Sequence, residues 1–257
     1  MNPARVTAVY FSPTFTSKAG AEAMARAISP DAASVDLTHV DAPLPPAFGP
    51  DELVVLGAPV YAGRLYSGCA ERMGRLRGQN TPCIVTVTYG NRAFDDALLE
   101  LSDLAQAGGF IPFAAAALVG QHTYGAIQVG RPDETDLASD AGFAKRALAR
   151  LQADQPVTPV AVPGNRPYRA GGGRGIFRPL TDEAKCIHCG LCARECPQNA
   201  IDRQDVSRID DNACLACFRC IRLCPTGAKN MDAPGYRTFA QEFTQELAAR
   251  CENQYFL

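Results

Sequence analysis

The sequence predicts an α/β fold: a doubly wound, five-stranded parallel sheet followed by a small, cysteine-rich α+β domain. Over residues 1–152, short apolar segments alternate with helical patterns. This alternation is typical of a parallel sheet covered by helices on both faces. A Pro/Gly-rich stretch then interrupts the pattern, and 8 of the 11 cysteines follow it, between Cys186 and Cys224.

The five predicted strands are apolar runs of the kind that a buried parallel sheet requires. They are Arg5–Phe11, Ala33–Leu37, Glu52–Leu56, Cys83–Thr88 and Phe110–Val119. Right-handed crossovers leave few topologies for such a chain, and an open sheet with a switch point is the commonest of them.

Four helices are predicted from their start and stop residues. Thr16 can cap a helix that runs through Ile28. Gly78 and the Gly108-Gly109 pair end the next two helices. The four ranges are Thr16–Ile28, Ser67–Leu76, Ala93–Ala107 and Asp133–Leu151.

Composition excludes several classes of protein. The 257 residues are 47% hydrophobic and 20% charged, a globular balance that excludes a disordered or fibrous chain. The formal charge of −2 excludes a strongly basic surface, so no nucleic-acid partner is expected. No apolar run approaches the roughly 20 residues of a membrane helix, and no signal peptide is evident. We therefore expect a cytoplasmic protein without membrane contact, in which thiols stay reduced and bind metal.

The predicted division of the chain is a front domain over 1–152, a linker over 153–179, a cysteine-rich domain over 180–233 and a C-terminal helix within 234–257. The linker carries four arginines with no acid among them: Arg166, Arg169, Arg174 and Arg178. They form either a solvated strap or a contact to a negatively charged neighbour. The aromatic residues from Tyr236 to Phe243 have helical spacing and are expected to dock on the protein's own surface. Residues 252–257 are assigned no structure.

The cysteines form a repeat of 28 residues, and each half reads C-x2-C-x2-C-x3-C-P. Three cysteines can wrap one loop around a cubane cluster, and the fourth then completes the other cluster. We therefore assign two [4Fe–4S] clusters with crossed ligands. The first set is Cys186, Cys189, Cys192 and Cys224, and the second is Cys214, Cys217, Cys220 and Cys196. Zinc is the competing metal, but zinc sites do not need the third cysteine or the C-P step.

This region resembles the bacterial two-cluster ferredoxin over about Thr181 to Met231. His188 lies inside the first loop and is expected to be a bystander. Cys69, Cys83 and Cys251 are expected to be packing residues.

The loop after the first strand is a candidate phosphate site. Hydroxyls and backbone N–H groups at a helix N-terminus can bind phosphate, and plain helix capping is the alternative. The chain has neither a GxxxxGK[ST] loop nor a GxGxxG turn after a strand. The candidate residues in this loop are Ser12, Thr14, Phe15, Thr16, Ser17 and Lys18.

Two further strand ends meet this loop in a doubly wound sheet, because parallel strands end at the same edge. They supply an aromatic face and turns whose N–H groups can bind a polar ring edge. The first comprises Pro59, Val60, Tyr61, Ala62, Gly63 and Arg64, and the second comprises Tyr89, Gly90, Asn91 and Arg92.

Together these loops resemble those of the flavodoxin fold, with strand order 2-1-3-4-5 and FMN at the switch point, over about Val6 to Leu151. The whole chain is similar to the flavodoxin–ferredoxin fusion family, and residues 121–136 also match what that family carries. Phe15 stands where the phosphate loop usually has glycine. The resemblance leaves two roles for it: a residue that weakens FMN binding, or an aromatic lid.

The predicted function is electron transfer between two [4Fe–4S] clusters and FMN, with a redox partner protein as donor or acceptor. One alternative is a ferredoxin-dependent reductase of a small substrate, with His122 and Tyr124 near the flavin or at a domain contact. The other is a ferredoxin module with a flavin-free docking domain. No residue is assigned a catalytic role. We also expect Arg64 or Arg92 to approach the flavin or its phosphate and stabilise the reduced anion, unless both pair with acids such as Asp95 and Asp96.

Overall fold

The computed structural model describes residues 1–153 and 156–257. The predicted linker, 153–179, contains residues 154–155, which lie outside these ranges. The strands of the described chain are β1 (Arg5–Tyr10), β2 (Ala33–Asp36), β3 (Glu52–Tyr61), β4 (Arg64–Leu65), β5 (Thr81–Tyr89), β6 (Phe110–Val119), β7 (Leu180–Thr181), β8 (Lys229–Asn230) and β9 (Gln254–Phe256). The helices are α1 (Thr16–Ile28), α2 (Ser67–Met73), α3 (Ala97–Ala107), α4 (Glu134–Gln152), α5 (Leu191–Arg194), α6 (Arg219–Leu223) and α7 (Pro234–Glu246).

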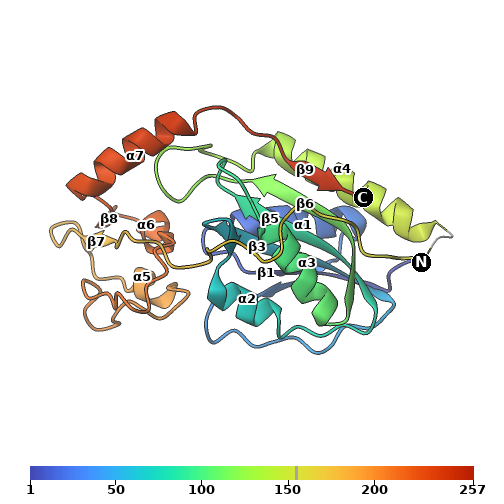
Figure 1. The fold of residues 1–257 in the computed structure, drawn as a ribbon. Coiled ribbons are helices and arrows are strands. Elements are labelled where there is room, and N and C mark those ends of the chain that lie inside the picture. The colour runs from blue at the N-terminus through green and yellow to red at the C-terminus, as the bar shows by residue number, and fades with distance from the viewer. Residues whose placement is uncertain (154–155) are drawn as a thin grey trace.

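The main sheet confirms the predicted architecture (Figure 1). Its parallel strands run in the order β2-β1-β3-β5-β6, which is order 2-1-3-4-5 for the five predicted strands. This order is the flavodoxin-like doubly wound arrangement. The strand β3 extends to Tyr61, so Pro59, Val60 and Tyr61 belong to a strand rather than to a loop.

Two strands of this sheet were not predicted. The strand β4 returns from β3 through the two-residue turn Ala62-Gly63, and both residues have positive φ, at 50° and 82°. That is the geometry of a type I′ hairpin turn, and Gly63 suits it. The strand β9 pairs antiparallel with β6, with Tyr255 opposite Ala116. The C-terminal residues left without structure in the sequence analysis therefore cover one edge of the sheet.

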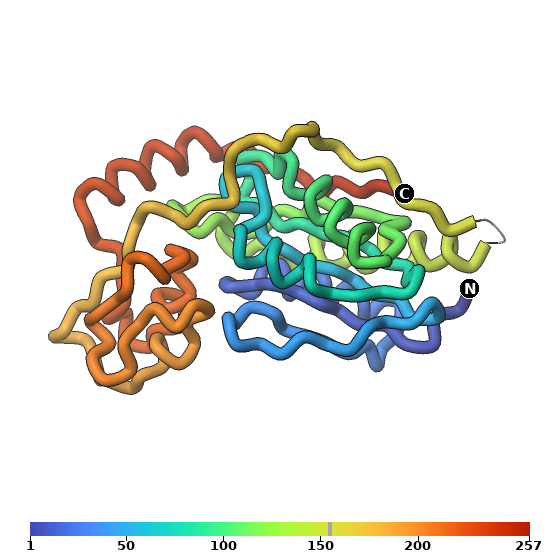
Figure 2. The backbone as a smooth tube through the Cα atoms, turned by 60° about the horizontal axis from the view of Figure 1, so that its bottom comes forward, coloured from blue at the N-terminus to red at the C-terminus, as the bar shows by residue number. Residues whose placement is uncertain are grey.

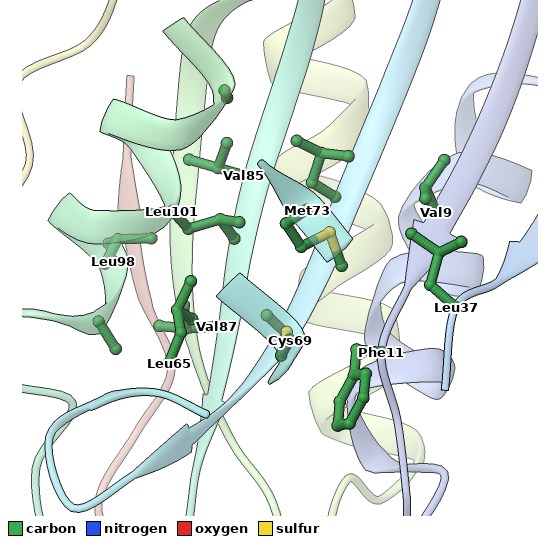
Figure 3. Packing of buried hydrophobic residues seen from close by; sticks show 14 of the residues in the cluster. Val9, Phe11, Leu37, Leu65, Cys69, Met73, Val85, Val87, Leu98 and Leu101 are labelled. Atoms are coloured by element: carbon green, nitrogen blue, oxygen red, sulfur yellow. The ribbon is translucent and has the colours of Figure 1, made fainter. Parts of the chain in front are cut away.

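Side chains of the sheet alternate between two apolar cores, as the period of a strand requires. Val9 of β1 and Phe11 directly after it pack toward α2 and α3, whereas Ala8 and Tyr10 pack toward α1 and α4. Figure 3 shows the first core, where Cys69 and Met73 of α2 lie over the sheet. Cys69 and Cys83 are fully buried in this core, in keeping with the packing role predicted for them.

The cysteine-rich domain lies beside one end of the sheet (Figures 1 and 2). It contains α5, α6, the β7–β8 pair and an isolated antiparallel bridge between Ile201 and Ile209. The helix α7 then leads back to β9. In the described part of the chain, no helix combines the length and hydropathy needed to cross a membrane.

Candidate flavin pocket and cysteine groups

A pocket of about 830 Å³, including its open mouth, lies at the carboxyl ends of β1, β3, β5 and β6. This is where ligands bind in open α/β sheets. Ten of the predicted site residues line it: Ser12, Thr14, Thr16, Ser17, Pro59, Val60, Tyr61, Ala62, Tyr89 and Gly90. The three strand ends that the sequence analysis grouped do meet in one place.

Two free hydroxyls lie at the pocket, one in the first turn of α1 and one near the end of β5. Phe15, the residue before this helix, makes no capping bond through its side chain. The hydroxyl oxygens Ser17 Oγ and Thr88 Oγ1 are buried and have no hydrogen-bond partner among the described residues. Buried polar atoms are normally paired, so these two hydroxyls fit a polar ligand. A helix N-terminus with free hydroxyls suits a phosphate group such as that of FMN.

The remaining six predicted residues do not line the pocket. Arg64 and Arg92, which were expected to approach the flavin or its phosphate, both pair with acids. The Arg64 guanidinium forms two bonds of 2.8 Å with the carboxylate of Glu100 and stacks on Tyr168. Arg92 pairs with Asp95, as the alternative proposed. Both cations are neutralised by acids of the front domain.

Asn91 holds the C-terminal segment instead of a ligand. Its side-chain amide donates to the carbonyl oxygens of Leu247 and Ala249, at 2.9 and 2.6 Å. Arg131, from the stretch 121–136, donates to the carbonyl oxygen of Cys251 at 2.6 Å. These polar residues therefore anchor the path to β9.

Lys18, Gly63 and Phe15 also have other roles. The Lys18 ammonium lies 3.9 Å from a carboxylate oxygen of Glu22. Gly63 forms the β3–β4 turn. Phe15 has a positive φ of 68°, and its ring lies under the guanidinium of Arg219, 4.4 Å away. The ring is thus a contact to the cysteine-rich domain and does not cover the pocket.

His122 and Tyr124 both line the pocket. The Tyr124 N–H donates to His122 Nδ1 at 2.8 Å, so the proton of a neutral imidazole is on Nε2. Burial lowers the pKa of His122 and raises the pKa of Tyr124 to about 12. The Tyr124 ring also contacts Phe177, Phe218, Tyr236 and Phe239. Tyr124 therefore takes part in both the pocket and the domain contact.

The segment 156–179, called the strap below, and the cysteine-rich domain complete the pocket wall. They do so through Gly173, Arg174, Gly175 and Ala216. The four strap arginines divide into two kinds. Arg166 and Arg169 pair with Asp103 and Asp95 of the front domain. Arg174 lines the pocket, and the Arg178 guanidinium lies 3.6 Å from Asp211, near the second cysteine loop. Three of the four therefore pair with acidic side chains, which is the contact to a negatively charged neighbour that was expected, and Arg174 borders the pocket.

The eight clustered cysteines line two separate hollows of about 350 Å³ each. One hollow contains Cys186, Cys189, Cys192 and Cys224, and the other contains Cys196, Cys214, Cys217 and Cys220. The fourth cysteine of each half thus lies with the first three of the other half. Within 1–153 and 156–257, no three His, Cys, Asp or Glu side chains converge where a single metal ion would bind. The thiols surround a space, an arrangement that suits a four-iron cluster.

The 28-residue repeat extends to the backbone. Positive φ occurs at His188 and Ala216, at Gly190 and Phe218, and at Asn199 and Gly227. Each pair is separated by 28 residues, so both loops follow the same path. Backbone N–H groups donate to cysteine sulfurs in both halves: Ala200 to Cys196 at 3.3 Å, Ala216 to Cys214 at 3.4 Å and Lys229 to Cys224 at 3.4 Å. Such bonds influence the potential of a bound cluster.

Each hollow also has one buried cation in its wall. Lys229 lines the first hollow, is 2% exposed and donates to the Thr181 hydroxyl at 2.7 Å. Arg219 lines the second hollow and is 5% exposed. Neither residue was among the predicted site residues. The only available signal was a basic residue close to a cysteine, which is too common to predict burial.

Comparison with known proteins finds one family model and several solved structures that match parts of the chain. Residues 185–228 match the family of the 4Fe-4S dicluster domain. No curated protein matches the chain. Among solved structures, an archaeal flavodoxin is 14% identical, with 58% of this chain and 99% of that chain covered and a TM-score of 0.38. The flavodoxin of Streptococcus pneumoniae is 15% identical over 57% and 99% of the two chains, with a TM-score of 0.39. The two-electron reduced flavodoxin of Megasphaera elsdenii is 19% identical over 55% and 98%, with a TM-score of 0.35.

The front domain has the strand order of the flavodoxin-like fold. The cysteine-rich domain matches the 4Fe-4S dicluster domain.

Proposed function

We propose that this chain is an electron-transfer flavoprotein that holds two [4Fe–4S] clusters and one FMN. The main support is the position of Ala216. It lies between Cys214 and Cys217 in the second cysteine loop, and it also forms part of the wall of the pocket at the sheet. One loop of four residues therefore borders both candidate cofactor sites.

The residues present fit these groups. Cys186, Cys189, Cys192 and Cys224 would hold the first cluster, and Cys196, Cys214, Cys217 and Cys220 the second. Ser12, Thr14, Thr16 and Ser17 would hold the FMN phosphate at the start of α1. When bound, the clusters would exchange single electrons and the flavin one or two, which links single-electron carriers to two-electron chemistry.

The two cysteine groups differ in access to solvent. Cys189 of the first group is exposed, and its neighbour Ile187 is 63% exposed. Cys214, Cys217 and Cys220 of the second group are each 8% exposed. The first group is therefore the place where a redox partner protein can approach, and the second group lies on the side of the flavin pocket.

Anaerobic purification followed by iron, sulfide and flavin analysis tests this proposal. The expected content is eight irons, eight sulfides and one FMN per chain. The Cys217→Ala protein should keep the flavin but lose its reduction by a protein donor. A chain that holds both clusters and has no affinity for FMN would contradict the proposal and favour the flavin-free docking domain.

A second candidate is reduction of a small substrate at the flavin, favoured by His122 and Tyr124 in the pocket wall. The Nε2–H of a neutral His122 is a donor in that wall. The two candidates differ in what reoxidises the reduced protein. If a small oxidant does so at a rate that falls in the His122→Gln variant, the chain is a reductase. If only protein acceptors do so, it is a carrier.

A further inference from the structure

Arg219 connects the cysteine-rich domain to the loop before α1. Its Nη1 donates to the carbonyl oxygens of Pro13 and Ser12, at 3.1 and 3.5 Å. Its Nη2 donates to the Glu195 carboxylate at 2.9 Å. The ring of Phe15 covers the other side of the guanidinium. This one side chain thus joins both domains at 5% exposure.

Arg219 and the loop backbone to which it donates border the two candidate cofactor sites. Ser12 and Pro13 line the flavin pocket. Glu195 directly precedes Cys196, and Arg219 itself directly precedes Cys220 and lines the second hollow. The buried cation therefore lies between the phosphate-type loop and the second cysteine group.

The charge of Arg219 is incompletely balanced by the protein. A guanidinium stays protonated in proteins, and burying it is costly unless it is paired. Its one ion-pair partner among the described residues is Glu195, whose side chain is 30% exposed. Its Nε is buried without a partner within the same residues. Arg219 can therefore stabilise a further negative charge nearby.

We propose that Arg219 is the shared counter-charge of the FMN phosphate and the second iron–sulfur cluster, and that it positions the phosphate loop against that cluster. The inference rests on the proposed function, in which both groups are anionic. The guanidinium favours the reduced, more negative state of the second cluster, and its bonds to the Ser12 and Pro13 carbonyls order the loop that receives the phosphate. Phe15 then occupies its position because its ring covers this cation.

The test compares three variants of the full chain. Arg219→Gln removes the charge, Arg219→Lys keeps the charge without the planar fork, and Arg194→Gln removes an exposed arginine beside the same glutamate. Each holoprotein is analysed for iron. The FMN dissociation constant is measured after removal and return of the flavin. The two clusters are titrated by EPR, with signals assigned in the Cys189→Ala protein.

We expect Arg219→Gln to weaken FMN binding about tenfold. The equilibrium constant for reduction of the second cluster should also fall about tenfold, which lowers the potential of that cluster by 59 mV for one electron. The first cluster should keep its potential. Arg219→Lys should restore the potential of the second cluster but only part of the FMN affinity, and Arg194→Gln should match the wild type in both.

Unchanged FMN affinity and unchanged second-cluster potential in Arg219→Gln would overturn the inference. Equal shifts of both clusters, or equal effects of Arg194→Gln, would also overturn it, because net charge alone would then explain them. If the Arg219→Gln protein loses iron, the Arg219→Lys protein is used for the decision. Wild-type FMN affinity together with a shifted potential of the second cluster in that protein would contradict the shared role. A wild-type chain that binds no FMN would contradict the proposed function, while the potential of the second cluster still tests Arg219.

Discussion

The two cysteine loops have the same motif and the same backbone path, yet they face different surroundings. The first loop presents Ile187 and Cys189 to solvent. In the second loop, Ala216 is 1% exposed and Phe218 is 5% exposed, and both lie against the front domain. The motif therefore specifies how a loop surrounds a cluster, and the residues between the cysteines specify what the loop contacts.

The largest expected effect comes from breaking one group of ligands. Cys224→Ala should remove the cluster that is held by Cys186, Cys189 and Cys192, because Cys224 lies in their hollow. Cys196→Ala should instead remove the cluster on the flavin side. Iron analysis and EPR of both variants measure the loss, which is expected to be about four irons in each case. Loss of the sequence-adjacent cluster in either variant would contradict crossed ligation.

Equivalent positions in the two loops should differ strongly in their influence on FMN. Ala216→Glu places a carboxylate in a buried wall of the pocket, and an unpaired buried charge costs at least about 3 kcal/mol. FMN binding should weaken at least a hundredfold. His188→Glu introduces the same charge at the exposed equivalent position, and the affinity should change by less than about twofold. Similar losses in the two variants would show that the loops do not differ in distance from the flavin.

A smaller effect is expected at the second pair of equivalent positions. Phe218→Leu removes ring contacts to Tyr124 and Tyr236, which are worth about 1–2 kcal/mol together. Amide exchange in residues 122–126 should therefore accelerate about tenfold. Gly190→Ala, at a φ of 70° with no atom within 4 Å of the added Cβ, should cost about 1 kcal/mol within the first loop. Exchange at 122–126 should remain unchanged in that control.

The smallest expected effect is a pH dependence of the contact between His122 and α7, near the second loop. Burial lowers the pKa of His122 below 6.5, its ordinary value. The unfolded state then takes up the proton first, so stability is lost as the pH falls below about 6.5 and is fully present above it. Protection of α7 from amide exchange should decline over this range, because the His122 ring packs on Phe243. His122→Gln should remove the decline. An identical pH profile in the wild type and the His122→Gln protein would contradict this prediction.

Local sequence patterns predicted most of the fold. Alternating apolar runs predicted the five parallel strands. The cap expected at Thr16 is wrong, because Phe15 occupies the cap position of α1 and Thr16 is the first residue of the helix. The strand β9 was missed because its three residues gain their structure only from pairing with β6, more than a hundred residues earlier. Such pairing leaves no local pattern in a short segment.

The site was predicted best where spacing determines geometry. The cysteines and the hydroxyls before α1 follow one another at short intervals, so their grouping could be inferred from the chain alone. The ion pair of Arg64 could not be predicted, because its partner, Glu100, is 36 residues away on another element. Phe15 was an unexplained departure until the structure placed Arg219 over its ring. Contacts between distant elements decide the roles of such residues.

The pairing of β9 with β6 makes the cysteine-rich domain doubly tethered. One tether is the strap that leaves the front domain after α4, and the other is α7 with the segment that returns to the sheet. A module held at both ends cannot swing away as one on a single flexible linker can, so its effective concentration at the sheet stays high. Asn91 and Arg131 shorten the second tether further, because they bind its backbone carbonyls. The distance between the second cysteine group and the pocket is thereby a property of the fold and does not depend on an encounter.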